Sequence, residues 1–207
     1  MKTSFLAECF PVLEKDLLKE IEEHSTLKSF NSQEYIVEQG KFIRFLPIVL
    51  SGNIKVFSNE DSIQFLLYYI SSGESCIYSF AHIFNNEPAE FSAIAELDSE
   101  LLLLPINKVN QWLKQYPSFS SLVLSDYQRH YKDLLNTTKQ ITCYNLDQRL
   151  LNYLKNKSKI KKSNILNISH QEIAYDLGTS REVISRLLKK LSLNNQVIQI
   201  GRKIKIL

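Results

Sequence analysis

The segment Ser169–Leu191 reads SHQEIAYDLGTSREVISRLLKKL and carries the strongest structural signal in this chain. In a helix-turn-helix, the first helix needs a small residue where the two helices cross, and the turn needs a residue that tolerates a positive φ. Ala174 and Gly178 stand at the spacing that these two positions require. Ile184 and Leu187 then fall on the inward face of the second helix. The segment therefore predicts two crossing helices joined by a turn at Gly178.

Both predicted helices begin with a capping sequence. Ser169 precedes Glu172 by three residues, and Thr179 stands in the same relation to Glu182. This is the spacing of a capping box, in which a hydroxyl and a carboxylate accept hydrogen bonds from free backbone N–H groups at a helix start. We therefore expect the second helix to begin near Ser180.

The outward face of the second helix predicts a surface for the major groove of DNA. Arginine can donate two hydrogen bonds to guanine, and glutamate can accept one from cytosine, each good pair giving roughly 1 to 3 kcal/mol of discrimination. Arg181 is the leading candidate for a base reader. Glu182 could instead serve only the capping box, and Ser185 could act through its small size. The candidate DNA-binding residues of this segment are Thr179, Ser180, Arg181, Glu182, Ser185, Arg186 and Lys189, of which Arg186 and Lys189 could also contact phosphate or solvent.

The C-terminal segment over residues 197–206 predicts a β-hairpin. Residues 197–206 alternate apolar and polar side chains around Gly201, which is typical of two strands joined by a tight turn. Arg202 and Lys203 lie at its tip, where they would contact phosphate and position the module without reading sequence. The C-terminal part is thus predicted to be a winged helix-turn-helix.

The charge of the chain is divided unevenly. Residues 1–144 hold 12 Lys and Arg against 18 Asp and Glu, a net charge of −6, whereas residues 145–207 hold 13 against 4, a net charge of +9. Neutralising phosphates with Lys and Arg releases counterions, which drives binding to nucleic acid. The basic part therefore indicates a polyanionic partner, although basic patches also occur on simply solvated surfaces.

The N-terminal part has the texture of an antiparallel roll. A short helix is expected over residues 11–24, and short β-rich runs then alternate with turn residues from Ser29 to Leu104. Many short strands with regular turns indicate a roll or barrel. The expected strands are 35–37, 48–50, 54–57, 64–70, 91–97 and 101–104.

Helical periodicity returns after Pro105, and a long helix is predicted over residues 118–142. Its apolar side chains follow the three-and-four spacing that a partner helix would cover, as in a symmetric dimer. Packing on the core of its own domain is the alternative. The stripe consists of Leu124, Tyr127, Tyr131, Leu134, Thr138 and Ile141. A further helix is expected over residues 145–157, and a lysine-rich loop over residues 155–164.

This order of parts resembles the Crp/Fnr family of transcription regulators. Arg181, Glu182, Ser185 and Arg186 match the pattern of the family's recognition helix, and the run Leu50–Val56 looks like the glycine turn of its β-roll. The resemblance implies an α+β fold. Its expected parts are an N-terminal antiparallel β-roll similar to cupin and cyclic-nucleotide-binding domains over 1–117, a long dimerisation helix over 118–143 and a C-terminal winged helix-turn-helix over 144–207.

The resemblance also implies partners. A homodimer would place two recognition helices in successive major grooves about 34 Å apart, on a palindromic site in double-stranded DNA. RNA polymerase is a further expected partner. We expect no membrane association and a cytoplasmic location, because no run of about 18 apolar residues occurs and Glu8 interrupts the N-terminal segment. We expect no enzymatic activity, because catalytic motifs such as H-E-x-x-H and G-x-S-x-G are absent.

Cyclic AMP binding does not carry over from the resemblance. Members that bind it present an arginine that neutralises the cyclic phosphate, and Phe91 stands in that place here. Lys55 is the only Lys or Arg from Phe45 to Asn107, and a desolvated phosphate needs a cationic partner. We therefore expect no cyclic AMP and no other cofactor.

The effector remains open at the level of sequence. The expected effector pocket consists of Cys76, Tyr78, Phe91 and Ser92. The three cysteines, Cys9, Cys76 and Cys143, lack the spacing of a metal site, so no metal is expected. The alternative function is a small-molecule or redox sensor, acting through a thiol or haem, whose main output is a change in dimer conformation.

Overall fold

The computed structural model describes residues 6–8, 10–60, 63–76, 79–80 and 87–207, without the side chains of residues 63, 137 and 140–142. The chain divides into two compact units, Met1–Ser58 with Leu67–Asp133, and Asn59–Leu66 with Leu134–Leu207. The division falls inside a long helix, and the three-part boundaries drawn from the sequence stay a prediction. Strands dominate the first unit and helices the second, which confirms the α+β fold class.

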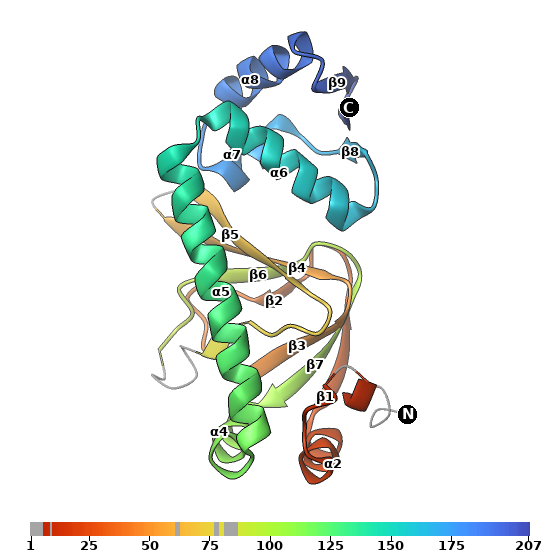
Figure 1. Cartoon of the computed structure of the whole chain (residues 1–207), viewed down its shortest axis with the longest axis vertical. Coiled ribbons are helices and arrows are strands. Elements are labelled where there is room, and N and C mark those ends of the chain that lie inside the picture. The colour runs from red at the N-terminus through yellow and green to blue at the C-terminus, as the bar shows by residue number, and fades with distance from the viewer. Residues whose placement is uncertain (1–5, 9, 61–62, 77–78, 81–86) are drawn as a thin grey trace. The chain divides into compact units, whose positions relative to one another are not determined.

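Two antiparallel sheets form the roll, one with strand order β1-β7-β3 and the other with order β2-β6-β4-β5 (Figure 1). The predicted antiparallel roll is therefore confirmed. Its strands are β1 (Thr26–Phe30), β2 (Tyr35–Val37), β3 (Phe45–Ser51), β4 (Asn53–Glu60), β5 (Ile63–Ser71), β6 (Ser92–Ala95) and β7 (Ser99–Pro105).

The β1-β7-β3 sheet separates two apolar cores, because side chains alternate between the faces of a strand. On β3, Leu46 and Ile48 belong to one core, which includes the fully buried Trp112. Val49 belongs to the other core, between the sheets, together with Phe91. The helices that contribute to the Trp112 core are α2 (Lys15–His24), α4 (Ile106–Gln115) and the first turns of α5 (Pro117–Cys143).

The second unit is a small α/β module built on one core. Leu154, Ala174 and Ile184 are fully buried in this core. Leu66, from the segment Asn59–Leu66 that belongs to this unit, packs against it. Three short strands form a sheet of order β8-β10-β9. The elements are α6 (Leu146–Lys161), β8 (Ile165–Asn167), α7 (His170–Leu177), α8 (Arg181–Leu193), β9 (Val197–Ile200) and β10 (Lys203–Ile206).

Some element boundaries differ from those predicted. Helix α2 begins at Lys15 rather than near residue 11, and β6 is shorter than the expected strand 91–97. The sequence does not predict β1, because four of its five side chains are exposed and show no alternation; its backbone pairing with β7 holds it in place.

The prediction of a lysine-rich loop over residues 155–164 is wrong as far as Lys161, because α6 continues to that residue. Tertiary burial explains this difference. The side chain of Lys157 is only 1 % exposed and lies inside the module rather than in solvent.

Candidate nucleic-acid interface

Helices α7 and α8 form the predicted helix-turn-helix. Gly178 ends α7 in the left-handed region, with φ of 63° and ψ of 47°, which a residue without a β carbon adopts at little cost. The N–H of the next residue, Thr179, donates to the carbonyl oxygen of Ala174 at 2.9 Å. Ala174 itself is fully buried in the core of the module. The predicted turn at Gly178 is confirmed, and the burial of Ala174 agrees with the small residue predicted where the helices cross.

Both helix starts are capped by serine. The Ser169 hydroxyl accepts from the N–H of Glu172 at 3.1 Å, as predicted. At α8 the cap is Ser180, whose hydroxyl accepts from the N–H of Val183 at 3.4 Å. The expected capping box from Thr179 is therefore wrong by one residue. The helix starts one residue later than that box requires, so its cap falls on Ser180.

The outward face of α8 carries the candidate base readers. Arg181, Glu182 and Arg186 are exposed, and so is Lys189 one turn further along. The pKa of Glu182 is lowered by its own backbone N–H and by the Ser180 hydroxyl, in that order. Glu182 is therefore an ionised acceptor at neutral pH, beside the positive charge of Arg181.

Ser185 differs from the other candidates on this helix. Its side chain is partly buried, and its hydroxyl donates to the carbonyl oxygen of Arg181 at 2.9 Å. Oγ of Ser185 also lies 2.8 Å from Nδ1 of His170. Because the Ser185 proton is used on the Arg181 carbonyl, His170 Nδ1 is the donor in this second hydrogen bond. The hydroxyl thus ties α8 to α7, a role that the sequence pattern did not indicate.

The inward face of α8 fixes the orientation of the arginines. Ile184 and Leu188 are fully buried, and Leu191 is nearly so. They pack with Leu150 and Ile173 of the neighbouring helices in a single core. Rotating α8 to turn Arg181 inward would expose these apolar groups, so burial on one face holds the charged face outward.

Strands β9 and β10 form the predicted hairpin. Their pairing is antiparallel, and Gly201 adopts a φ of 58° in the turn between them. Arg202 and Lys203 are exposed at the tip. Below the tip, Ile204 is buried in the core of the module, which anchors the hairpin. The predicted wing and its basic tip are confirmed.

A buried group of ionic and polar side chains connects α6 to α7, the first helix of the helix-turn-helix. The hydroxyl of Tyr153 donates to Oδ2 of Asp176 at 2.7 Å, and both side chains are buried. Nζ of Lys157 lies 3.7 Å from Oε1 of Glu172 and 4.0 Å from Oδ2 of Asp176. This group is not apparent in the sequence, because its four residues on α6 and α7 become neighbours only when the helices pack.

Helix α5 leaves much of its predicted dimerisation stripe in solvent. The side chains of Leu124 and Tyr131 are 63 % and 62 % exposed, and Tyr127 and Leu134 are also exposed. Thr138 is exposed as well, and the side chain of Ile141 lies outside the described residues. The long helix is therefore present, and its apolar stripe is not covered by the core of its own unit.

Three of the four expected effector residues lie in the core of the roll. Cys76 and Phe91 are 1 % exposed and belong to the core between the two sheets, and Ser92 is also buried. Oγ of Ser92 accepts from the N–H of Gln39 at 3.1 Å. Tyr78 lies outside the described residues. Phe91 thus contributes packing at the place where the resemblance would require a cation.

A cluster of charged and polar side chains joins α5 to the segment after β5. Arg129 donates to Oε1 of Glu74 at 2.6 Å and to Oδ1 of Asp126 at 2.9 Å. The hydroxyl of Ser75 donates to Oδ2 of Asp126 at 2.8 Å, and Nε2 of His130 lies 3.3 Å from the Ser75 carbonyl oxygen. Burial raises the pKa of Asp126, against the opposing effects of Ser75 and Arg129. This cluster brings Arg129 to the roll, and its guanidinium is already engaged by two carboxylates.

Two general properties of the described residues complete the site. They contain no group of three or more His, Cys, Asp or Glu side chains that could hold a metal ion. None of the helices in the described part of the chain combines the length and the apolar character needed to cross a lipid bilayer.

Fold and site together define a DNA-binding transcription regulator with a β-roll and a winged helix-turn-helix. The family model of the cyclic nucleotide-binding domain matches residues 27–116, and that of the Crp-like helix-turn-helix domain matches residues 148–207. The two matches together cover more than two thirds of the chain. The chain belongs to the Crp/Fnr family of transcription regulators.

Named relatives agree with this assignment. The cAMP-activated global transcriptional regulator CRP of Haemophilus influenzae is 23 % identical over 87 % of this chain and 84 % of its own length. A transcriptional regulator of the Crp/Fnr family from Eubacterium rectale superposes with a TM-score of 0.88 at 24 % identity, over 97 % of this chain and 94 % of its own. The c-di-GMP responsive regulator CLP of Xanthomonas campestris gives a TM-score of 0.78 at 20 % identity, over 93 % and 99 %. At these identities the structural likeness establishes the fold.

Proposed function

We propose that this regulator acts as a homodimer on a palindromic DNA site, with α8 of each protomer in a major groove. The outward face of α8 is the observation that carries the proposal. Arg181, Glu182 and Arg186 are exposed there, while Ile184 and Leu188 on the same helix are fully buried. A helix with this division of faces presents its charged side chains to a groove without losing its own core contacts.

Each charged side chain receives a separate role. Arg181 and Arg186 can each donate two hydrogen bonds to guanine, and the ionised Glu182 can accept from the amino group of cytosine. Arg202 and Lys203 at the hairpin tip contact phosphate and set the register of the module on the duplex. The DNA sugar-phosphate backbone beside α8 is contacted by Lys189, Thr179 and Ser180. The Ser185 hydroxyl is committed within the protein, so Ser185 acts by permitting close approach.

The dimer in this proposal is formed along α5. Leu124, Tyr127, Tyr131 and Leu134 are large apolar side chains that the chain leaves exposed, and 27 residues make α5 about 40 Å long. A symmetric pair of α5 helices would bury the same stripe twice. Two recognition helices related by that symmetry would read half-sites about 34 Å apart, which is why the site should be an inverted repeat.

We further propose that the roll does not take cyclic AMP. Support comes from Phe91, which is packed in the core at the expected phosphate position, and from Arg129, which is held by Glu74 and Asp126. A buried phosphate without a free cation would be strongly disfavoured. Calorimetric titration with cyclic AMP should give no saturable heat, and a stoichiometric binding curve would overturn this part of the proposal.

Membership in a family of transcription regulators supports two further parts of the proposal. The DNA-bound dimer would act on transcription through contact with RNA polymerase, and the protein would reside in the cytoplasm with its DNA target. Co-purification of RNA polymerase with the protein on its selected DNA site, but not on a scrambled duplex, tests the first of these.

The central test is selection of binding sites from random duplexes, followed by affinity measurements on the selected site. An inverted repeat should emerge. Arg181→Ala should lose about 1 to 3 kcal/mol of binding free energy in each half-site on the selected sequence, with little change on unrelated DNA. Arg202→Ala should weaken binding to the selected site and to unrelated DNA alike. It should reduce the slope of log K against log salt by about two, one for each protomer.

A matched control is available in Lys114→Ala, which removes one exposed positive charge from α4 of the first unit. Its affinity for the selected site should equal that of the unmodified protein. Selection that enriches no palindrome, together with unchanged binding by Arg181→Ala, would refute the proposed recognition by α8.

A further inference from the structure

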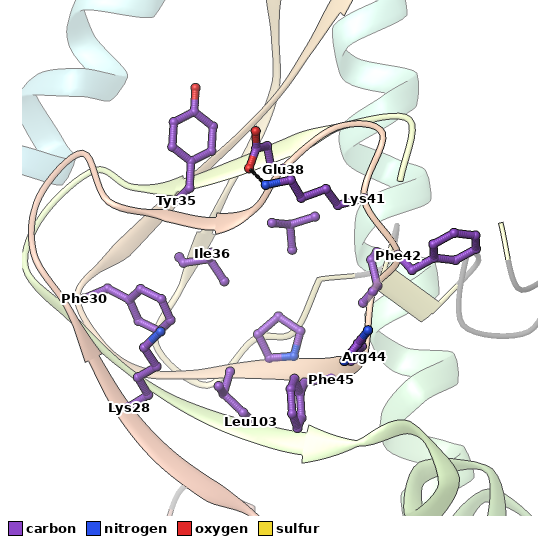
Figure 2. A pocket seen from close by; sticks show the side chains of 13 residues that line it. Lys28, Phe30, Tyr35, Ile36, Glu38, Lys41, Phe42, Arg44, Phe45 and Leu103 are labelled. Carbon is purple, nitrogen blue, oxygen red and sulfur yellow. Dashed lines mark ion pairs between the residues drawn. The ribbon is translucent and has the colours of Figure 1, made fainter. Parts of the chain in front are cut away.

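A pocket of about 350 Å³ opens on the first unit, and its lining residues do not include Cys76, Phe91 or Ser92 (Figure 2). It lies between β2 with the residues that follow it and the strands β3 and β7. Its interior is apolar, and Figure 2 shows Phe30, Ile36 and Leu103 facing the same space. The remaining apolar side chains inside are Val37, Ile43 and Pro47.

Positive charge gathers at the edge of this pocket. Lys28, Lys41 and Arg44 line it, and Glu38 is the only acidic side chain among its lining residues. Glu38 is paired with Lys41, as the dashed line in Figure 2 marks. The Nζ atom of Lys28 lies 4.4 Å from the centre of the Phe30 ring. Within the described part of the chain, neither Lys28 nor Arg44 has a carboxylate partner, so the pocket carries an excess of two positive charges.

This excess is unusual for its surroundings. Residues 1–144 carry a net charge of −6 and only 12 Lys and Arg, of which three line this single pocket. The acidic surface of the unit repels an anion elsewhere, and the pocket attracts one. The charge of the pocket therefore favours an anionic ligand.

The rim of the pocket leaves aromatic surface in water. Tyr35, Phe42 and Phe45 line it and are 54 %, 57 % and 42 % exposed. Single exposed apolar side chains are ordinary, but three aromatic rings around one hollow form a patch of the kind that marks a binding site. A ligand with an apolar body would cover part of these rings as it enters.

We propose that this pocket binds a small organic anion, made of an apolar body of one or two rings and a carboxylate. The body lies on Phe30, Ile36 and Leu103, and the carboxylate pairs with Arg44, whose planar guanidinium matches a carboxylate with two parallel hydrogen bonds. Lys28 supplies the second positive charge. The volume stands at the lower end of the roughly 300 to 1,000 Å³ found for ligand pockets, which favours a compact ligand. The assignment does not depend on DNA binding, because no residue of α8 takes part.

The test uses 2-naphthoate as the probe and 2-naphthalenemethanol as its uncharged counterpart, each titrated calorimetrically into the full chain. Naphthoate should occupy one saturable site per chain and bind about tenfold more tightly than the alcohol, as expected for a hydrogen-bonded charge pair. Its affinity should fall as salt is added, because the cations at the rim are exposed to solvent.

Variants separate the pocket from other sites. Lys28→Gln with Arg44→Gln should weaken naphthoate about tenfold, to the level of the alcohol, while Arg44→Lys retains part of the gain and Lys114→Gln changes nothing. Lys28 and Arg44 are exposed, and a thermal melt of each variant checks that the fold is kept.

Several results would overturn the assignment. They are equal binding of naphthoate and the alcohol, unchanged binding in the double variant, and the absence of a saturable site. A change in oligomeric state of the double variant, seen by light scattering, would identify the pocket as a protein interface instead.

Discussion

Replacing Gly52 by alanine should destabilise the first unit far more than replacing Gly73, although both glycines have similar positive φ values of 91° and 83°. A β carbon at Gly73 would meet nothing within 4 Å. At Gly52 it would come within 2.7 Å of both the carbonyl oxygen of Asp98 and the Cα of Ser99, and closer still to the Ser99 hydroxyl. The two substitutions therefore share a backbone cost and differ in a steric one.

The magnitudes follow from these contacts. An L-residue in the left-handed region costs about 1 to 2 kcal/mol, which applies at both positions. At Gly52 the added carbon also presses on Oγ of Ser99, which accepts from the N–H of Asn53 at 3.2 Å and donates to the carbonyl oxygen of Leu97 at 2.6 Å. Overpacking costs about 1 to 3 kcal/mol and a lost hydrogen bond about 0.5 to 1.5 kcal/mol. We therefore expect about 3 to 6 kcal/mol for Gly52→Ala and about 1 to 2 kcal/mol for Gly73→Ala.

Urea unfolding followed by tryptophan fluorescence measures this difference in the relevant unit. Trp112 is the single tryptophan of the chain and is fully buried in the core of the first unit, so its emission reports on that unit alone. The midpoints are compared at a common m value, because a change in m would indicate a different unfolding reaction. Equal midpoints for the two variants would refute the argument that close approach to Ser99 requires glycine at position 52.

Three further predictions concern the helices. Tyr131→Glu places a charge in both halves of the proposed symmetric α5 interface. Like charges facing each other cost several kcal/mol, so light scattering should show dimers for the unmodified protein and monomers for the variant. An unchanged dimer would exclude the α5 stripe as the interface. Burial raises the pKa of Asp126 above its ordinary value of 3.8, so the native state binds the carboxyl proton of Asp126 more tightly than the unfolded chain does. The stability gained from binding this proton is lost as pH rises through the raised pKa. Asp126→Asn should therefore lose less stability on going from acidic to neutral pH, and melting curves that shift in parallel for both proteins would contradict this. Tyr153→Phe removes the donor to the buried Asp176 and should cost the second unit about 1 to 3 kcal/mol, measured by faster amide hydrogen exchange in α7; unchanged protection would show that Lys157 alone satisfies the carboxylate.

The helix-turn-helix could be predicted closely because its signals are local. Ser169 caps a helix that starts at the next residue, Gly178 supplies the left-handed turn, and both effects act within a few residues of the chain. The one error, a cap placed at Thr179 instead of Ser180, arose because adjacent hydroxyl residues offer the same chemistry. Short β-rich runs bounded by turn residues likewise located most strands of the roll.

The errors elsewhere come from contacts between distant segments. The lysine-rich end of α6 was predicted to be a loop, yet burial of Lys157 near Glu172 and Asp176 joins it to the module. Arg129 is brought to Glu74 only by the packing of α5 on the roll, so no pattern around Glu74 reveals it. The cationic pocket gathers Lys28 and Arg44 with Leu103, which are far apart in the chain.

The sequence by itself determined the order of the parts, the helix-turn-helix with its basic wing and the charge division that points to DNA. Backbone dihedral preferences, capping and side-chain periodicity act over a few residues, so they can be read without knowing the fold. Only the tertiary structure decided which ionisable groups become neighbours, which cations remain unpaired and where a pocket opens. These depend on burial and on distances between segments far apart in the chain, because electrostatic and packing energies follow separation in space rather than in sequence.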